Sequence, residues 1–566
     1  MLILKTIRFL ILIISSYGWI VFLTEKKIKA EFSVMLFISG TGSLMFAAGL
    51  LNILEITSLF IAVAGLVFTI RSLRKGQMPV DLLSWGIIFF IFSLVALFAL
   101  LYGTKFTRYD NFSHWAVVAR EILENNRFPN FQDQLITFQS YPPGSAAFIY
   151  YICKVSGIHS EWMMMYAQGI ATVGMLVPLF AFCKKARNIV LPIITIIFIL
   201  CCNIRLVDIC VDTLLLCTGS AGVLFCIYYQ KRVHDLYPAL IPVLIFLVSI
   251  KNSGIFFAAG IIVYFLLVCG KRNLKQAVIL SAVTLVTILL WKQHVSLVFE
   301  SGMTTKHSMS LANLGSTFTE KTKDDILQIT DRYLKSVFTL RNEFFYFAVG
   351  IICLLLFCIK TKKKYRSFVI KNSVFCIMIY IVYQFSLLGM YLFSMPTNEA
   401  MNMASYDRYH MTILGFLVII MLPQVMSVTF SKMQLSLAWY SVTALVEYAS
   451  LTPDLNYLLR IDWEETERYR YEKVIEDYEV PVRSSYLVLR NDDDYGYSYY
   501  FYRYYLESSQ VEVFTDEQLP DLEEIRDYYE YIIILDGTEE EYNYVQNTLG
   551  IDSTDRVIKL SEWENQ

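Results

Sequence analysis

Acidic and basic side chains that could do chemistry stand beside apolar runs in this 566-residue chain. The first is Asp110, in YDNFSHW at 109–115, directly after such a run. A carboxylate in this place could act as a general base that removes a proton from a hydroxyl group. The structural alternative is a carboxylate that ends a helix or pairs with Arg108. Ionisable groups at membrane depth are costly, so each is a functional candidate.

Basic residues at the same level could bind a phosphate, whose charge cationic donors stabilise. Lys251 interrupts an apolar stretch in SIKNSG, and Arg408 stands in YDRYH. Lys251 could instead extend its ammonium group to water, and Arg408 could pair with Asp407. The loop sequence GMTTKHSMS adds Lys306 and His307 as further candidates.

A third set could hold a sugar or a second substrate through aromatic and polar contacts. Its members are His114, Trp115, Tyr141, Asp208, Asp212 and Glu399. Asp208 and Asp212 are four residues apart and would share a helix face, so they could orient a substrate together or pair with Arg205. His114 could equally bond to lipid headgroups or to the backbone.

Two short segments should position these groups. Ser113 is expected to cap an amphipathic helix at 113–124 that lies in the membrane interface. In YPPG at 141–144, the prolines exclude a preceding helix and Gly144 permits a sharp turn into about 11 apolar residues, too few to span a bilayer. This second helix should wall a cavity, although a buried turn without a ligand is the alternative.

The elements behind these segments are membrane spans. Of the residues, 56% are hydrophobic and 17% are charged. An ordinary soluble protein has fewer hydrophobic and more charged residues. Runs long enough for a hydrocarbon core of about 30 Å predict about 14 transmembrane helices. They lie near 8–23, 33–52, 54–70, 82–102, 162–183, 189–204, 210–229, 237–250, 254–269, 277–292, 344–359, 369–394, 409–429 and 433–450. We therefore expect an all-α polytopic membrane protein.

Charge divides the chain into two domains. Residues 1–450 carry a net charge of +17, and residues 451–566 carry −19. The basic residues of the first part lie in short loops that alternate with the candidate ones, which predicts that these basic loops face the cytoplasm. The same count places 103–161, 293–343 and 395–408 outside, together with the acidic domain. A nucleic-acid-binding protein is excluded, because the basic residues form no stripe with aromatic partners.

The acidic domain should be a small extracytoplasmic α/β layer. The runs SSYLVL, VEVF, YIIILD and RVIKL predict strands, and YSYYFYRYYLESS, LPDLEEIRDYYEY and TEEEYNYVQNTLG predict helices. The domain has 17 of the 38 tyrosines, which could stack on sugars or simply form its core, and none of the 11 cysteines. The cysteines form no CxxC pair, so we interpret them as small apolar residues in helices.

These features together resemble the GT-C superfamily of membrane glycosyltransferases, and most closely its bacterial branch similar to protein mannosyltransferases and lipid A aminoarabinose transferases. The resemblance depends on YDNFSHW at 109–115, on YPPG at 141–144, on the VD pairs that end at Asp208 and Asp212, and on a soluble domain after the last span. It covers roughly residues 82–450. One departure is Asn111, where many relatives carry a second acidic residue, so a role for a divalent cation is left open.

The resemblance implies an inverting transfer of a sugar from an undecaprenyl-phosphate-linked donor to a cell-envelope glycan or lipid-linked polymer. Asp110 would be the base, and Lys251, Arg408, Lys306 and His307 would receive the departing phosphate. The lipid tail would stay in the membrane throughout.

Two other functions are consistent with the sequence. An O-antigen-type polymerase or ligase would also gather cations on the outer face, and its activity would depend on Arg408 rather than on Asp110. A lipid-linked-sugar flippase or transporter would bind the donor without consuming it. A tail-only function with the helices as an anchor is disfavoured, because fourteen spans exceed what anchoring requires.

Overall fold

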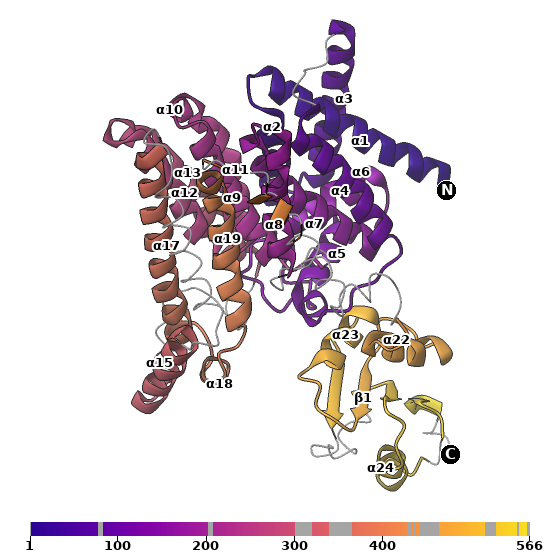
Figure 1. Ribbon diagram of the computed structural model, residues 1–566. Helices are drawn as coiled ribbons and strands as arrows, with labels where there is room; N and C mark the ends of the chain where they lie inside the picture. Colours follow the sequence, from indigo (N-terminus) through magenta and orange to yellow (C-terminus); the bar gives the residue numbers. More distant parts are fainter. Residues whose placement is uncertain are drawn as a thin grey trace.

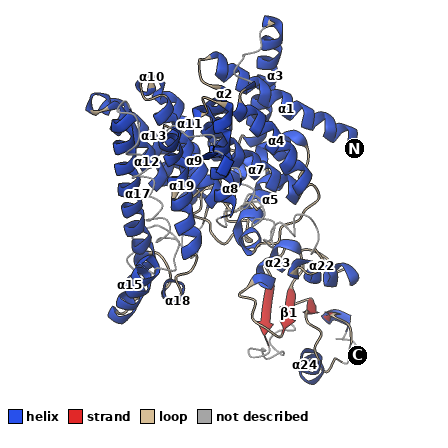
Figure 2. Ribbon diagram, in the orientation of Figure 1, coloured by secondary structure: helices blue, strands red, loops and turns tan. Residues whose placement is uncertain are grey.

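A helical body and a smaller α/β region make up the protein. The computed structural model describes residues 2–76, 83–201, 208–299, 318, 320–338, 365–427, 433–434, 436–437, 440, 463–515, 528–551 and 554–562. In Figure 1 the body fills the upper part of the view and the α/β region lies below α5. The strands are confined to that lower region (Figure 2).

The body consists mainly of apolar helices. Its described α-helices are α1 (Leu2–Glu25), α2 (Ala30–Leu50), α3 (Leu54–Lys75), α4 (Trp85–Leu101), α5 (Ala116–Asn125), α6 (Gly144–Ser156), α7 (Glu161–Leu176), α8 (Val190–Cys201), α9 (Asp212–Tyr228), α10 (Val233–Leu236), α11 (Leu240–Ile250), α12 (Gly254–Cys269), α13 (Leu274–Val298), α15 (Lys323–Phe338), α17 (Arg366–Phe393), α18 (Thr397–Met401) and α19 (Tyr406–Met426). Their apolar side chains pack into one continuous cluster that runs through most of the body.

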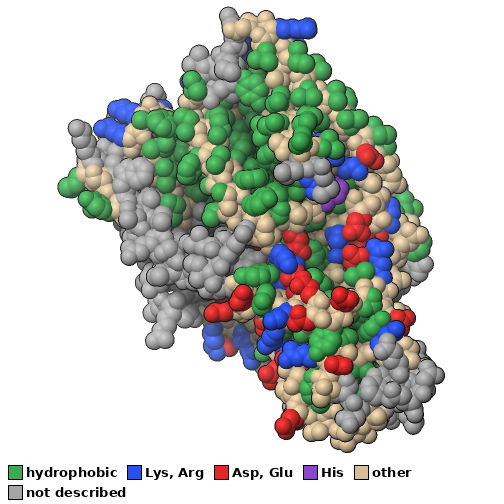
Figure 3. Space-filling model, turned by 90° about the vertical axis from the view of Figure 1, so that its right-hand side faces the viewer, with side chains coloured by type: hydrophobic (Ala, Val, Ile, Leu, Met, Phe, Trp, Pro, Cys, Tyr) green, Lys and Arg blue, Asp and Glu red, His purple; other side chains and the backbone are tan. Residues whose placement is uncertain are grey.

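Within the described residues, eight helices are long and apolar enough to cross a membrane. Four shorter apolar helices accompany them: Trp85–Leu101, Ala186–Ile199, Asp212–Tyr228 and Gly254–Cys269. The expected span at 344–359 lies outside the described residues, as does most of the one at 433–450. The chain is thus a mostly helical membrane protein, and Figure 3 shows apolar side chains covering the body above a zone where charged groups gather.

The basic loops meet at one end of the body. Lys29 donates from its backbone to the Tyr229 hydroxyl (2.8 Å) and from its ammonium group to the Ala181 carbonyl (3.2 Å). Lys75 pairs with Glu25 at 2.8 Å. Figure 1 places α10, which follows the basic pair at 231–232, at the top of the view and the α/β region at the bottom. The segments around Lys29, Lys75, Ala181 and Tyr229 therefore lie together at this end of the body.

The α/β region is a four-stranded sheet with helices on both faces. Its elements are α22 (Glu467–Asp477), β1 (Tyr486–Arg490), α23 (Tyr497–Tyr505), β2 (Val511–Thr515), β3 (Tyr531–Ile534), α24 (Glu539–Leu549) and β4 (Val557–Lys559). The strand order is β2-β1-β3-β4, with β1 parallel to β2 and β3 and with β4 antiparallel to β3. The four predicted strands and the helices from 497 and from 538 are confirmed, whereas most of the third predicted helix lies outside the described residues.

Alternate residues of the sheet face two different cores, because successive side chains of a strand point to opposite faces. Leu487 and Leu489 pack with Ile532 and Ile534 in a small cluster that includes Val545 of α24. Tyr486, Val488 and Ile533 instead join the large cluster that continues into α22, α23 and the body. The sheet is therefore anchored to the membrane-embedded part through its second face.

The segment expected as an interfacial helix has a different start. A π-helical turn, η2 (Asn111–Trp115), precedes α5, and Ser113 lies inside this turn without capping it. Asp110 at the turn's start already has helical backbone angles (φ −60°, ψ −24°), so no cap residue is needed at 113. The apolar residues of α5 are buried and the helix packs against α6. The apolar face is thus covered by protein and not by lipid.

Candidate active site

Asp110 lies where the segment after α4 enters the π-helical turn. The Asp110 side chain is 37% exposed. Its neighbour Asn111 is buried and accepts a hydrogen bond from the Ile209 backbone N–H at 3.4 Å, which ties the turn to the segment before α9. Single π-helical turns are frequent at functional sites, since the inserted residue re-aims its neighbours.

Four ionisable residues from four separate segments form one charge cluster. Arg408, in the first turn of α19, places Nη1 2.5 Å from Asp110 Oδ2 and Nε 3.4 Å from Asp212 Oδ2. Lys251 Nζ lies 2.8 Å from the other Asp212 oxygen, Oδ1. We call these four residues the charge cluster. Two carboxylates and two cations make it neutral, so it can be buried at the edge of an apolar body.

Lys251 reaches the cluster because the chain is extended between two helices. Its backbone angles (φ −160°, ψ 153°) end α11, and α12 begins at Gly254. The ammonium group also lies 5.3 Å from the centre of the Tyr409 ring. Since the Lys251 and Asp212 side chains are each only 10% exposed, this pair forms the inner half of the cluster.

Gly144 of YPPG is needed for close packing next to Lys251. A Cβ atom on Gly144 would stand 2.1 Å from Ser249 Oγ and 2.6 Å from the Ser249 carbonyl oxygen. The expected short helix is α6, and its first residue touches the chain two residues before Lys251. Besides starting the expected short helix after the two prolines, the glycine thus permits a close approach of α6 to Ser249.

An aromatic group lies beside the charge cluster. His114 has ring contacts with Trp115 (4.7 Å), Phe138 (5.4 Å) and Tyr141 (5.3 Å), and Tyr141 stacks on Trp115 and Phe138. Burial, assisted by the charge of Lys251, lowers the pKa of His114 to about 3. No polar atom of the described residues hydrogen bonds to its Nδ1. His114 is thus a neutral, buried ring whose Nδ1 is available for a hydrogen bond to a ligand.

Tyr141 faces the charge cluster from this aromatic group. Burial raises its pKa to about 12, while the charges of Lys251, Asp212 and Arg408 also act on the phenol. A protonated phenol can donate a hydrogen bond to a substrate oxygen. Phe138 and Tyr141 are the partly exposed rings of the aromatic group, and Tyr141 adds a hydroxyl group near Lys251. Rings with a few polar atoms are typical of small-molecule binding sites.

Asp208 shapes the segment before α9. One of its carboxylate oxygens accepts the Cys210 backbone N–H at 2.8 Å. Cys210 Sγ then lies 3.5 Å from Asp212 Oδ2 and 3.9 Å from Asp110 Oδ2. Burial and the nearby carboxylates raise the pKa of this thiol, so it stays protonated and can donate to them.

The remaining predicted residues are placed less directly. Glu399, in α18, lies close enough to Tyr109 that its charge contributes, after burial, Tyr500 and Asp110, to a raised pKa of that phenol. Lys306, His307 and Arg205 lie outside the described residues.

Cys210 and Tyr409 were missed by the sequence reasoning. Cys210 was interpreted as an apolar helix residue, although its place between Asp208 and Asp212 could have identified it. Tyr409, whose ring lies 5.3 Å from Lys251 Nζ and 5.4 Å from Arg408 Cζ, directly follows Arg408 in the chain. Aromatic faces attract cations at such distances, so Tyr409 helps to hold both.

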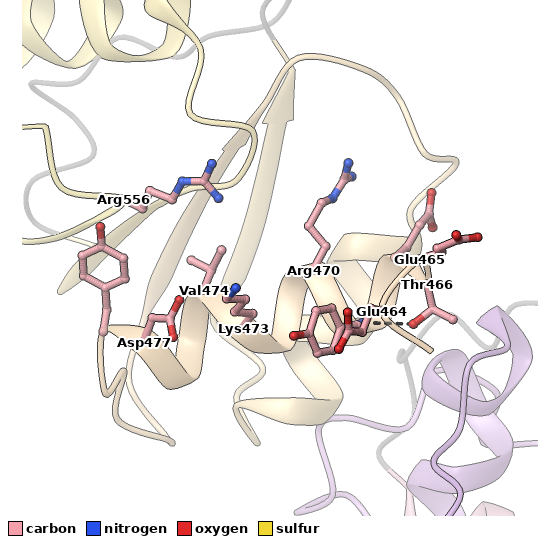
Figure 4. A pocket seen from close by; sticks show the side chains of 11 residues that line it. Glu464, Glu465, Thr466, Arg470, Lys473, Val474, Asp477 and Arg556 are labelled. Atoms are coloured by element: carbon pink, nitrogen blue, oxygen red, sulfur yellow. Dashed lines mark hydrogen bonds between the residues drawn. The ribbon is translucent and has the colours of Figure 1, made fainter. Parts of the chain in front are cut away.

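A separate cavity lies away from the charge cluster. A cavity of about 510 Å³ in the α/β region is lined by Arg470, Lys473, Asp477 and Arg556 among others (Figure 4). It mixes both signs of charge and lies on the exposed face of α22, away from Asp110. Within the described ranges, no three His, Cys, Asp or Glu side chains are arranged to hold a metal ion.

No family model matches the chain, and neither the curated proteins nor the solved structures give a match. The resemblance to the GT-C superfamily therefore depends on the short motifs alone, and the function has to be argued from the geometry.

Proposed function

We propose that this membrane protein is an inverting glycosyltransferase that moves a sugar from an undecaprenyl-phosphate-linked donor to a cell-envelope glycan or lipid-linked polymer. The observation that carries the proposal is the charge cluster, in which Asp110, Arg408, Asp212 and Lys251 converge next to an aromatic group at one end of an apolar helical body. A donor with an apolar tail and a phosphate head would present its sugar at this level.

The proposed reaction uses Asp110 as the base. The acceptor hydroxyl attacks the anomeric carbon, Asp110 takes its proton, and the bond from that carbon to the phosphate oxygen breaks. The electron pair of that bond leaves with undecaprenyl phosphate. Because the hydroxyl attacks from the face opposite the departing phosphate, the new sugar linkage has the opposite anomeric configuration. A cation close to the departing oxygen stabilises its developing charge.

Arg408 is the better placed of the two cations for this role. Its side chain is 34% exposed, against 10% for Lys251. An incoming phosphate can compete with Asp110 for the guanidinium group, and this exchange would release Asp110 to act as a base. Lys251 holds Asp212 through a 2.8 Å ion pair, and Asp212 attracts Arg408 through an ion pair at 3.4 Å that is not a hydrogen bond.

The orientation belongs to the proposal as well. By the positive-inside rule, the end that carries Lys29 and Lys75 is cytoplasmic, which places the charge cluster and the α/β domain on the extracytoplasmic side of the cell membrane. A lipid-linked donor that has been flipped across the membrane would reach the charge cluster on the extracytoplasmic side.

A transfer assay with the purified full chain tests the proposal. Wild-type protein and Asp110→Asn are offered a panel of undecaprenyl-phosphate sugars with glycan acceptors, and release of undecaprenyl phosphate is followed. We expect about 10²- to 10⁴-fold slower release in the variant, the usual contribution of general base catalysis. Asp235→Asn is the matched control, because this carboxylate is 69% exposed on α10 and lies 3.4 Å from Nε2 of the neighbouring His234.

Three results would contradict the proposal. Full activity of Asp110→Asn would remove the base, and loss of activity in Arg408→Met but not in Asp110→Asn would favour a polymerase or ligase. Donor binding without any release by folded wild-type protein would favour a transporter.

A further inference from the structure

The α/β domain contacts the chain segment that leads to Asp110. Arg468, on α22, is 2% exposed, and its guanidinium group donates to the Phe106 carbonyl (2.5 Å) and to Glu161 (2.7 and 3.1 Å). Nη2 also lies 3.2 Å from Glu472 on the same helix. Arg468 therefore joins the domain to the segment before Asp110 and to the start of α7.

Phe106 is fixed from both of its backbone groups. Its N–H donates to Glu161 Oε2 at 2.6 Å, while its carbonyl accepts from Arg468. The preceding residue, Lys105, forms a 2.8 Å ion pair with Glu472 of the domain. Two cations and two carboxylates thus hold this backbone, four residues before Asp110.

Contacts from α23 continue the attachment on both sides of Asp110. The Tyr497 hydroxyl donates to the Thr107 carbonyl at 3.0 Å. After Asp110, the buried ring of Phe112 packs against the rings of Tyr497 (5.6 Å), Phe501 (5.4 Å) and Tyr504 (5.4 Å). Asp110 is consequently the partly exposed middle of a segment that the domain holds at 105–107 and again at 112.

The type of contact indicates positioning and not merely attachment. Apolar packing would attach a domain at least as well, because buried ion pairs lose much of their attraction to desolvation. A network of directed, charge-assisted hydrogen bonds favours one geometry instead. Arg468 makes its bonds through Nη1 and Nη2, while its Nε has no hydrogen-bond partner among the described residues. Here that network ends on the backbone that carries the proposed base, and a displacement of about 1 Å at a reacting group can cost about 10²-fold in rate.

We infer that the C-terminal α/β domain positions Asp110 for proton transfer, with Arg468 as the principal positioning residue and Tyr497 as a second. This inference rests on the proposed function of Asp110. The cavity on the opposite face of α22 (Figure 4) takes no part in it, because the docking face of this helix is the one that carries Arg468 and Glu472.

Two variants and one control separate positioning from stability. Arg468→Met removes the charged contacts while keeping an apolar stem. Tyr497→Phe keeps the ring against Phe112 and removes the hydroxyl group that donates to the Thr107 carbonyl. The control is Arg490→Met, since Arg490 is also buried but bonds within the domain, to Asp494, Ser498 and the Tyr471 hydroxyl (3.0 Å).

Two readouts are taken on the full-length protein in detergent. Hydrogen–deuterium exchange of peptides covering 103–115 reports whether the segment is held, and donor turnover gives kcat and KM. For Arg468→Met we expect faster exchange in these peptides and a kcat lowered by about 10- to 100-fold at unchanged donor KM. For Tyr497→Phe we expect kcat to be lowered by about 2- to 10-fold, which corresponds to the net contribution of one hydrogen bond. Arg490→Met should leave both readouts near the wild-type values.

The outcomes are distinct. Unchanged exchange at 103–115 in both variants, or faster exchange with unchanged kcat, would overturn the inference, as would a change in donor KM alone. If Arg468→Met does not fold, Tyr497→Phe decides by the same criteria. If the wild-type protein turns over no donor, the proposed function fails, and the exchange data still show whether the domain holds the segment.

Discussion

Removing Lys251 should destabilise the protein and should do so mainly through Asp212. At 2.8 Å and an effective dielectric constant of about 20, the two charges attract each other by about 6 kcal/mol before desolvation is subtracted. Breaking a buried pair by deleting one partner costs about 3–5 kcal/mol, because the other charge stays buried. Asp212 retains Arg408 at 3.4 Å, so for Lys251→Met we expect the low end, about 3 kcal/mol.

Thermal unfolding in detergent, followed by tryptophan fluorescence, measures this cost. For a cooperative chain of this length, about 3 kcal/mol corresponds to a decrease of about 2–3 °C in Tm. The double variant Lys251→Met/Asp212→Asn should recover at least half of that loss, because no unpaired charge remains. Lys75→Met is the matched control: its pair with Glu25 has the same 2.8 Å distance, but the two side chains are 46% and 25% exposed. Exposed pairs contribute at most about 1 kcal/mol.

The reasoning would be refuted if Lys251→Met melted together with the wild type, or if the double variant were no more stable than the single one. Either result would mean that Asp212 and Lys251 do not depend on each other for burial.

Three further predictions concern the surroundings of the charge cluster. Gly144→Ala should slow donor turnover by about tenfold or more, because its Cβ would push α6 away from Ser249; Gly389→Ala, whose Cβ meets nothing within 4 Å, should not. Burial first, and then the charge of Asp133, raises the pKa of Glu121 to about 7, so its contribution to stability is complete below its unfolded pKa and is lost as the pH rises through 7; in Glu121→Gln the decrease in Tm between pH 5.5 and pH 8 should become smaller. The pKa of His114 is lowered to about 3, so its contribution is complete above its unfolded pKa and is lost as the pH falls towards 3; His114→Phe should flatten the decrease in Tm between pH 7.5 and pH 4.5.

The place of the candidate site at the ends of the membrane spans could be predicted from the sequence better than the contacts within the site. Asp110, Asp212, Lys251 and Arg408 were identified from their places beside apolar runs, which depend only on hydropathy and charge. Their pairing depends on how distant helices pack. Arg408 follows Asp407 in the chain, yet it forms ion pairs with Asp212 and with Asp110, which is 298 residues away.

Contacts between segments that are distant in the chain also explain the other differences between the prediction and the structure. The strands of the α/β domain were predictable because their apolar runs are short and bounded by turn residues. The docking contacts of this domain were not, since nothing local to Arg468 indicates Phe106 and Glu161 as partners. Ser113 was expected to cap a helix from its residue type alone, whereas the backbone is already helical at Asp110.

The exposures within the charge cluster separate groups that can exchange partners from groups that hold them. Asp110 and Arg408 are each about one-third exposed, so an incoming phosphate can reach their contact, whereas Lys251 and Asp212 are almost enclosed. If Asp110 moved freely, releasing Arg408 would also let the base swing away from the acceptor. The domain contacts at Phe106 and Phe112 hold the backbone on either side of it. Asp110 can therefore lose its cation and keep its place, as the proposed mechanism requires of a base that acts only after a donor has bound.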